Sequence, residues 1–234
     1  YNVDELQLIG LPETPRPLKA IFDFKIEGIP FSFEQEVAYK YNSPEDGEVF
    51  QPFEITPELF VDVENKVYIF ADHQPRTVQV IVTSGANNQQ GKVSIPLPDG
   101  WSVDPEYYDF NLEQKGESQS FRFDITPPED PSDISINPII ESQGRQYTRK
   151  LIEIDYDHIP LQTVLRPAQS RLVKINIQKR GNNIAYIMGA GDDIPSSIKQ
   201  IGYRVTELSL EEVSLERLQQ FDALILGVRA YNTL

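Results

Sequence analysis

The sequence has no cysteine, and only two histidines, one methionine and one tryptophan occur among its 234 residues. Without cysteine there are no disulfides, no thiol nucleophile and no cysteine-ligated metal. The absence of cysteine does not indicate the cellular compartment of the protein. The two histidines, His73 and His158, are far apart in the chain, whereas a catalytic zinc needs three protein ligands. We therefore assign no catalytic and no metal-binding residue to this segment. Long apolar runs are also lacking, and no stretch approaches the roughly 20 apolar residues of a membrane span.

Basic residues are scarce in the front part of the chain. Residues 1–160 contain 12 Lys and Arg against 29 Asp and Glu, a net charge of −17, whereas residues 161–234 contain 9 against 7, a net charge of +2. An acidic surface repels a phosphate backbone, so nucleic acid is excluded as a partner. We interpret the acidic front as a solvated surface, with a calcium-binding surface as the alternative.

What is abundant are the residues of turn-dense β structure, with 18 Pro, 11 Tyr and 12 Phe. In residues 1–64, apolar residues alternate over Leu18–Ile26 and again over Phe31–Tyr41, with the turn residues Glu27–Pro30 between them. This pattern predicts a first, small antiparallel β-sandwich.

Residues 65–157 show the same alternation in three further stretches, Thr77–Thr83, Gly91–Leu97 and Phe121–Thr126. Strands separated by turn signals at this spacing are typical of an immunoglobulin-like sandwich. Arg149–Tyr156 would be its closing strand. Residues 158–183 are predicted to form a basic linker between this sandwich and the last part of the chain. The linker is expected to contain one more strand, over Leu172–Ile177.

The period of the hydrophobic pattern changes in residues 184–234, where strand-like and helix-like stretches alternate. Three apolar stretches, Ile184–Met188, Tyr203–Leu208 and Phe221–Leu226, alternate with helical patterns. This alternation predicts a parallel sheet in a partial α/β domain of the flavodoxin or Rossmann kind, with the first strand between the other two. The predicted fold class is therefore mixed: two antiparallel β-sandwich modules, a linker and a truncated α/β domain.

Three strands make a poor parallel sheet, so we expect the chain to be a piece of a longer protein. The outer edge of the third strand would then present unpaired backbone groups. We predict self-association through the Phe221–Leu226 edge, or coverage of that edge by the Leu172–Ile177 strand folding back.

The carboxyl edge of this sheet is where open α/β sheets bind ligands. The loop after the first strand, Gly189–Asp193, lacks the third glycine of a dinucleotide motif because Ile194 stands in its place. Its two Asp residues would also repel a phosphate, so we interpret the loop as a structural turn that caps a helix. The alternative is a ligand crevice formed by five residues from this loop and from the end of the chain: Gly189, Gly191, Asp192, Arg229 and Tyr231.

Three aromatic residues are candidates for a sugar platform: Trp101, Tyr107 and Tyr108. Carbohydrate-binding sandwiches stack such rings on sugars. Large aromatic residues in a small sandwich more often belong to its core. We favour the core and keep the sugar platform as the alternative.

The chain also carries a resemblance. The succession Gly91–Trp101, Lys115–Ser118 and Phe123–Pro128 resembles the β-sandwich accessory module found beside bacterial glycosidases. Together with His158–Thr163 and Gly227–Asn232, it resembles the C-terminal, non-catalytic portion of large bacterial PIG-L-type (LmbE-like) deacetylases. The resemblance spans most of the chain after residue 40, and its motifs are structural.

This resemblance implies a non-catalytic accessory segment of an N-acetylglucosaminyl deacetylase, with carbohydrate as a partner and an extracytoplasmic location, periplasmic or secreted. The family holds its zinc on a Pro-His-Pro-Asp-Asp-Glu motif that this sequence does not contain, so the zinc is expected in a catalytic domain elsewhere. The C-terminal part of this family resembles a glutamine-amidotransferase domain, which the resemblance therefore implies in truncated form for residues 184–234. Such a domain uses a Cys nucleophile, and because this sequence has no Cys we expect a catalytically silent α/β domain here. The alternative is a carbohydrate-binding or envelope scaffold protein with no enzymatic parent. A third hypothesis, an enzyme built on the α/β crevice, is disfavoured because no nucleophile–base pair is evident.

Overall fold

The computed structural model describes residues 10, 16, 18–45, 47–156 and 158–233. Strands make up 54% of the described residues and helices 8%, so this part of the chain is mostly β, as the alternating pattern predicts. The chain forms two compact units. The first contains residues up to Pro57 together with Leu151–Arg166, and the second contains Glu58–Lys150 together with Pro167–Leu234.

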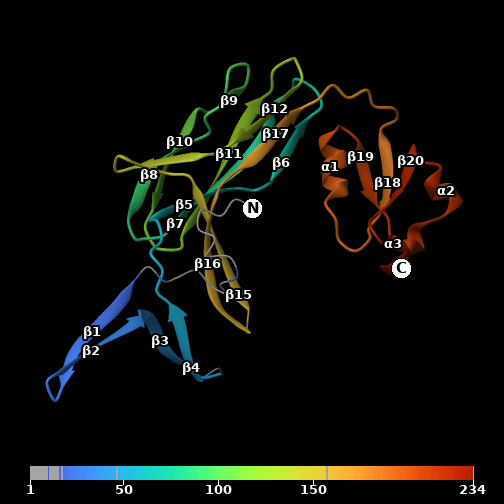
Figure 1. Ribbon diagram of the computed structural model, residues 1–234. Coiled ribbons are helices and arrows are strands. Elements are labelled where there is room, and N and C mark those ends of the chain that lie inside the picture. Colours follow the sequence, from blue (N-terminus) through green and yellow to red (C-terminus); the bar gives the residue numbers. More distant parts are fainter. Residues whose placement is uncertain (1–9, 11–15, 17, 46, 157, 234) are drawn as a thin grey trace. The chain divides into compact units, whose positions relative to one another are not determined.

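The second unit contains a sandwich-like arrangement of three sheets, which we call the sandwich; its strand pairs are antiparallel except for the parallel pair β17–β6 (Figure 1). One sheet has the strand order β5 (Leu59–Val63), β7 (Arg76–Ser84), β11 (Ser118–Thr126) and β9 (Ser102–Asp104). Another has the order β10 (Tyr107–Leu112), β8 (Gln89–Ser94), β13 (Ile139–Ser142) and β14 (Arg145–Tyr147). A third has the order β12 (Ser132–Ile136), β17 (Ser170–Lys174) and β6 (Val67–Phe70).

One shared hydrophobic core holds these sheets together. Val78, Val80 and Val82 of β7 are fully buried, while the residues between them reach the outer face. On the neighbouring strand, Phe123 lies opposite Val78 and Phe121 lies opposite Val80. Burying a side chain of this size stabilises a fold by about 1.5–3 kcal/mol. The alternation that the sequence predicts for this part of the chain is confirmed.

The first predicted sandwich, over residues 1–64, does not form among the described residues. β1 (Lys19–Ile26) pairs with β2 (Ile29–Glu36), and β3 (Ala38–Ser43) pairs with β4 (Gly47–Pro52), each pair as a separate two-stranded sheet. The hairpin itself is as the turn residues Glu27–Pro30 predict, because β2 begins directly after the Glu27–Gly28 turn. The prediction of a sandwich was wrong because alternation fixes which face of a strand is apolar, and not whether a second sheet covers that face.

Three strands have other neighbours than the pattern indicates. β5 pairs with β7 and therefore belongs to the sandwich rather than to the first module. β15 (Arg149–Tyr156), expected to close the sandwich, pairs instead with β16 (Ile159–Pro167) in the first unit. β17 lies between β12 and β6, so the predicted folding back of the Leu172–Ile177 strand onto the third parallel strand does not occur. Leu172 is fully buried in the sandwich core, which accounts for this placement.

Residues 183–226 contain a three-stranded parallel sheet in the order β19 (Arg204–Glu207), β18 (Asn183–Ile187) and β20 (Ala223–Leu226) (Figure 1). The predicted order, with the first strand in the middle, is confirmed. The associated helical segments are short: α1 (Ile194–Gln200), the 3-10 turn η2 (Leu210–Glu212), α2 (Leu215–Leu218) and α3 (Ala230–Thr233). A flavodoxin- or Rossmann-like domain is not supported by this structure.

Candidate functional site

Trp101, the first residue of the predicted sugar platform, lies in the sandwich core. Its side chain is 7% exposed and packs edge-on against Phe70, with 5.2 Å between the ring centroids and an interplanar angle of 82°. Its indole Nε1–H donates a 3.1 Å hydrogen bond to Ser132 Oγ. A buried ring presents no face to a sugar, so the core interpretation holds for Trp101.

Tyr107 and Tyr108 are consecutive residues of β10, so their side chains point to opposite faces of the sheet. Tyr108 packs on the rings of Phe121 and Phe123, and its hydroxyl donates a 2.8 Å hydrogen bond to the carbonyl oxygen of Arg122. Tyr107 is 47% exposed, with Lys92 Nζ 4.0 Å from its ring centroid. The three aromatic residues therefore do not form one platform, and Tyr107 alone offers a ring to solvent.

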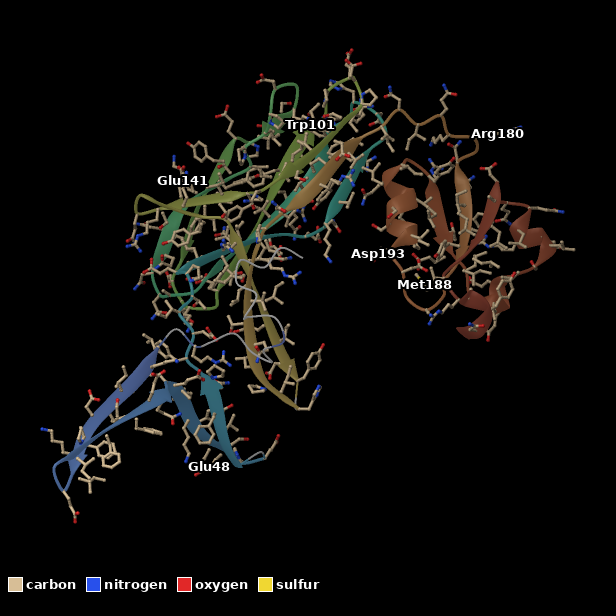
Figure 2. All side chains as sticks on the ribbon, in the orientation of Figure 1. Glu48, Trp101, Glu141, Arg180, Met188 and Asp193 are labelled. Carbon is tan, nitrogen blue, oxygen red and sulfur yellow. The ribbon has the colours of Figure 1, made fainter. Side chains whose placement is uncertain are left out.

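The outer face of the β10–β8–β13–β14 sheet, beside Tyr107, contains a pocket with a volume of about 840 Å³. We call it the sheet-face pocket. Ligand pockets commonly measure about 300–1,000 Å³. Eight polar or charged residues contribute to its lining: Gln90, Lys92, Asp109, Glu141, Ser142, Gln143, Arg145 and Gln146. Glu141 is labelled on this part of the sandwich in Figure 2.

Four of these side chains form one row across the sheet. In the strand register, Asp109 lies opposite Lys92, Lys92 lies opposite Glu141, and Glu141 lies opposite Gln146. The Gln146 side-chain amide donates a 3.0 Å hydrogen bond to Glu141 Oε1. A cation between two carboxylates and an amide offers donors and acceptors at short intervals on a rigid sheet.

Gly91 allows the strands under the pocket to approach closely. A Cβ atom at this position would lie 2.3 Å from the carbonyl oxygen of Glu141 and 3.1 Å from the ring of Phe110. Ser142 Oγ also donates a 2.6 Å hydrogen bond to the carbonyl oxygen of Gln90, which ties β13 to β8 at this point. The floor of the pocket is thus built from backbone that lacks space for any side chain at residue 91.

Sequence reasoning missed this pocket, although it singled out Tyr107, whose ring contacts the lining residue Lys92. The polar residues of β8 and β10 alternate with buried ones, which predicts a solvated face and gives no sign of a pocket. The strands β13 and β14 were not predicted at all. Only the register of four strands brings Asp109, Glu141 and Gln146 into one row.

The first unit contains a second pocket, of about 560 Å³, lined by residues of the β3–β4 and β15–β16 hairpins. Glu48 and Phe50 come from the first hairpin, and Asp155, Tyr156 and His158 from the second. The rings of Tyr156 and His158 stack, with centroids 5.8 Å apart. Both hairpins are two-stranded and their strands contain no buried residue, so this pocket has a less rigid frame than the sandwich.

In the predicted α/β crevice, Asp192 holds two loops together. Its Oδ1 accepts hydrogen bonds from the Tyr186 hydroxyl at 2.6 Å and from the backbone N–H of Ile194 at 3.2 Å. Its Oδ2 accepts from the backbone N–H of Val228 at 3.1 Å. The bond from Tyr186 and those from Val228 and Ile194 lower the pKa of Asp192 against the opposing effect of burial. The carboxylate that was a candidate ligand group thus joins the loop after β18 to the loop after β20.

Two glycines let these loops touch. A Cβ atom at Gly189 would lie 2.1 Å from the carbonyl oxygen of Val228, and one at Gly227 would lie 2.6 Å from the backbone nitrogen of Gly189. The backbone N–H of Ala190 donates a 2.8 Å hydrogen bond to the carbonyl oxygen of Val228. These contacts favour the structural-turn interpretation of the glycine-rich loop. Met188 and Asp193, labelled in Figure 2, mark this end of the sheet.

Two other crevice candidates, Gly191 and Tyr231, are not brought into this contact. Gly191 has a φ of 81°, and a Cβ atom at this position would have no neighbour within 4 Å. Tyr231 lies on α3 and is 84% exposed. Arg229 has a left-handed φ of 58°. Asp193 stands at the N-cap of α1, as predicted, but its side chain makes no capping hydrogen bond, and Asp192 makes the bond to Ile194 instead.

Tyr186 is the residue that sequence reasoning missed here. Its side chain is fully buried, and burial, followed by its hydrogen bond to Asp192, raises its pKa to about 12. A tyrosine inside an otherwise apolar strand requires a partner for its hydroxyl, and that requirement was the available signal.

Within the described residues, no group of three or more His, Cys, Asp and Glu side chains is arranged to hold a metal ion. Among the helices in that same part of the chain, none has the length and apolar character to cross a bilayer.

No known protein family matches the chain, and no curated protein matches it. Among solved structures, it is similar over 56% of its length to a family 123 glycoside hydrolase from Clostridium perfringens, studied for glycolipid glycan hydrolysis, with 7% identity and a TM-score of 0.32. The chain spans 30% of that hydrolase. It is also similar to WR4, an MSP family member from C. elegans, with a TM-score of 0.29 and 10% identity. This similarity covers 50% of this chain and 98% of the MSP family member. A protein of unknown function from Porphyromonas gingivalis gives a TM-score of 0.27 and 9% identity, and the similarity covers 56% of this chain and 60% of that protein. Likenesses at this level carry no argument about function.

Proposed function

We propose that this chain is a non-catalytic accessory segment that binds carbohydrate in the sheet-face pocket. The observation that carries the proposal is the row of Asp109, Lys92, Glu141 and Gln146 across four strands, with the half-exposed ring of Tyr107 beside it.

The chemistry of this row suits a sugar. A sugar hydroxyl both donates and accepts hydrogen bonds, so it pairs with carboxylates, which accept, with an ammonium group, which donates, and with an amide, which does both. Lys92 holds the Tyr107 ring beside the pocket through its cation–π contact. An aromatic ring next to closely spaced polar groups can contact the apolar C–H face of a pyranose while the polar groups bind its hydroxyls.

The place of the site in the fold also supports the proposal. The strands under the row bury Val93, Phe110 and Ile140, so their backbone positions are fixed by the sandwich core. Sites on packed strands keep their side chains in register better than sites on exposed hairpins. For this reason we favour the sheet-face pocket over the second pocket, although the second pocket contains more aromatic side chains.

The resemblance to PIG-L-type deacetylases supplies the expected ligand class, N-acetylated sugars, and the finer parts of the proposal. In this interpretation the segment positions a zinc-containing catalytic domain on its substrate outside the cytoplasm, and residues 184–234 belong to an α/β domain. The alternative is a carbohydrate-binding or scaffold protein without an enzymatic parent. A Pro-His-Pro-Asp-Asp-Glu motif in the reading frame upstream of Tyr1 distinguishes the two.

The proposal is tested by calorimetric titration of the 234-residue chain with N-acetylglucosamine trimers and with their deacetylated counterparts. We expect Glu141→Gln to weaken binding about tenfold, because a hydrogen bond to a charged group contributes about 1.5–3 kcal/mol. Glu129→Gln makes the same change of charge in a loop outside the pocket and should leave the affinity unchanged. Equal affinities for the parent chain and both variants, or no binding of either sugar, would contradict the proposal.

A further inference from the structure

One face of the β1–β2 hairpin carries six large apolar side chains that nothing in the described structure covers. The strand register places Phe22 opposite Phe33, Phe24 opposite Phe31, and Ile26 opposite Ile29. Each of the six is between 45% and 60% exposed. We call this set the aromatic ladder.

The ladder is continuous. The rings of Phe24 and Phe31 stack with their centroids 5.8 Å apart and an interplanar angle of 16°. The rings of Phe22 and Phe33 lie 6.4 Å apart at 33°. The remaining pair on this face, Ala20 and Gln35, is uncharged.

Every charged side chain of the two strands lies on the opposite face. Because side chains alternate along a strand, residues 19, 23, 25, 34 and 36 point away from the ladder. Lys19 and Glu34 pair with each other there. A partner can therefore cover the ladder without burying a charge, which would otherwise cost several kcal/mol.

An isolated two-stranded hairpin is at best marginally stable in water, and it becomes stable when its apolar face is covered. Exposed apolar patches of this kind usually mark an interaction site. The ladder is also self-complementary. A two-fold axis would stack the cross-strand Phe pairs of one copy, which we call its rungs, on the same pairs of another copy.

We propose that the aromatic ladder is the surface through which two copies of this chain associate face to face. Taking about 200 Å² for each large apolar side chain, the half-exposed ladder offers about 600 Å² per copy. A pair of ladders then buries about 1,200 Å², which is at the lower end of the range for stable specific interfaces. The two hairpins form a four-stranded, two-layered sandwich whose sheets pack about 10 Å apart. This surface is separate from the outer edge of β20, the site at which the sequence alone predicts self-association.

Sedimentation velocity over a range of concentrations tests the proposal with three variants of the 234-residue chain. The double variant Phe24→Ser/Phe31→Ser removes the central rung and should raise the dimer dissociation constant at least tenfold. Ile21→Ser removes a side chain that is more exposed, at 64%, but lies on the opposite face, and it should leave the constant unchanged. Leu224→Lys places a charge on the edge strand β20 and should also leave it unchanged. Near-ultraviolet circular dichroism of Trp101 checks in each variant that the sandwich is folded.

A second measurement needs no substitution. In hydroxyl-radical footprinting, Phe24 and Phe31 should become protected as the concentration of the parent chain rises, while Ile21 stays reactive. A parent chain that remains monomeric at high concentration overturns the proposal. Binding of that monomer to phosphatidylcholine vesicles would then identify a lipid surface, and not a second copy, as the partner of the ladder. Loss of association in Ile21→Ser or Leu224→Lys overturns it as well.

Discussion

The hydroxyl group of Tyr186 donates a 2.6 Å hydrogen bond to the carboxylate of Asp192, which joins the buried central strand of the parallel sheet to the loop at its carboxyl end. The same carboxylate accepts from the backbone of Val228 after β20. One acidic side chain thereby fixes both loops of the edge at which α/β sheets bind ligands.

The first prediction concerns this pair at high pH. Burial of Tyr186, with Asp192 beside it, raises the pKa of its hydroxyl to about 12, whereas an unfolded tyrosine titrates near pH 10. Its contribution to stability is therefore complete below about pH 10 and is lost as the pH rises from about 10 to about 12, because the unfolded state releases the proton first. Urea unfolding followed by circular dichroism should show a smaller loss of stability over this range in Tyr186→Phe than in the parent chain. An identical pH dependence in both would contradict the assignment.

The second prediction concerns the acid side. Because the pKa of Asp192 is lowered in the folded state, its contribution to stability is present above about pH 4 and is lost as the pH falls further, through its folded pKa. Asp192→Asn should reduce the stability at pH 7 and flatten its acid dependence. Asp193→Asn is the matched control, since the Asp193 side chain makes no capping hydrogen bond. Equal melting temperatures for the two variants at pH 7 would refute the role of Asp192.

The third prediction tests the sandwich core. Trp101→Ala should reduce the free energy of unfolding by about 3–5 kcal/mol, the usual cost of truncating a buried aromatic side chain. Trp101→Phe retains most of the packing against Phe70 and should cost less, mainly the hydrogen bond to Ser132. Denaturant titration followed by far-ultraviolet circular dichroism gives both values. An unchanged melting temperature in Trp101→Ala would contradict the buried placement.

The fourth prediction tests the floor of the sheet-face pocket. Gly91→Ala should destabilise the protein by about 1–3 kcal/mol, because its Cβ atom would press against the Glu141 backbone, which cannot rotate away. Ser120→Ala, on the outer face of β11, introduces no such contact and should change the stability little. A stable Gly91→Ala variant would show that β8 and β13 are further apart than described.

The sequence was a good guide wherever one face of a strand alternates and turn residues delimit it. Thr77–Thr83 and Phe121–Thr126 were predicted to alternate along their strands, and the valines of β7 and the phenylalanines of β11 are indeed the buried residues of that alternation. The order of the three parallel strands also followed from the alternation of strands with helical patterns, because doubly wound folds place the first strand between the other two.

Alternation was a poor guide to strand partners. Leu18–Ile26 has the same pattern as a sandwich strand, yet no second sheet among the described residues covers its hairpin. β15 pairs with β16 and not with a strand of the sandwich, whereas β17 pairs with two strands of the sandwich. The pairing of distant segments depends on which apolar faces fit together, and the pattern of a single strand does not contain that information. The sheet-face pocket was missed for the same reason, since its row of side chains exists only in the register of four strands.

The most direct test of the central claim is a titration of the isotope-labelled chain with N-acetylglucosamine trimers, followed by amide chemical shifts. We predict that the shifts that move most belong to β8, β10 and β13 around Lys92, Asp109 and Glu141. Residues that line the second pocket, such as Tyr156, should move little. Shifts centred on the second pocket, or no change at saturating sugar, would contradict the claim.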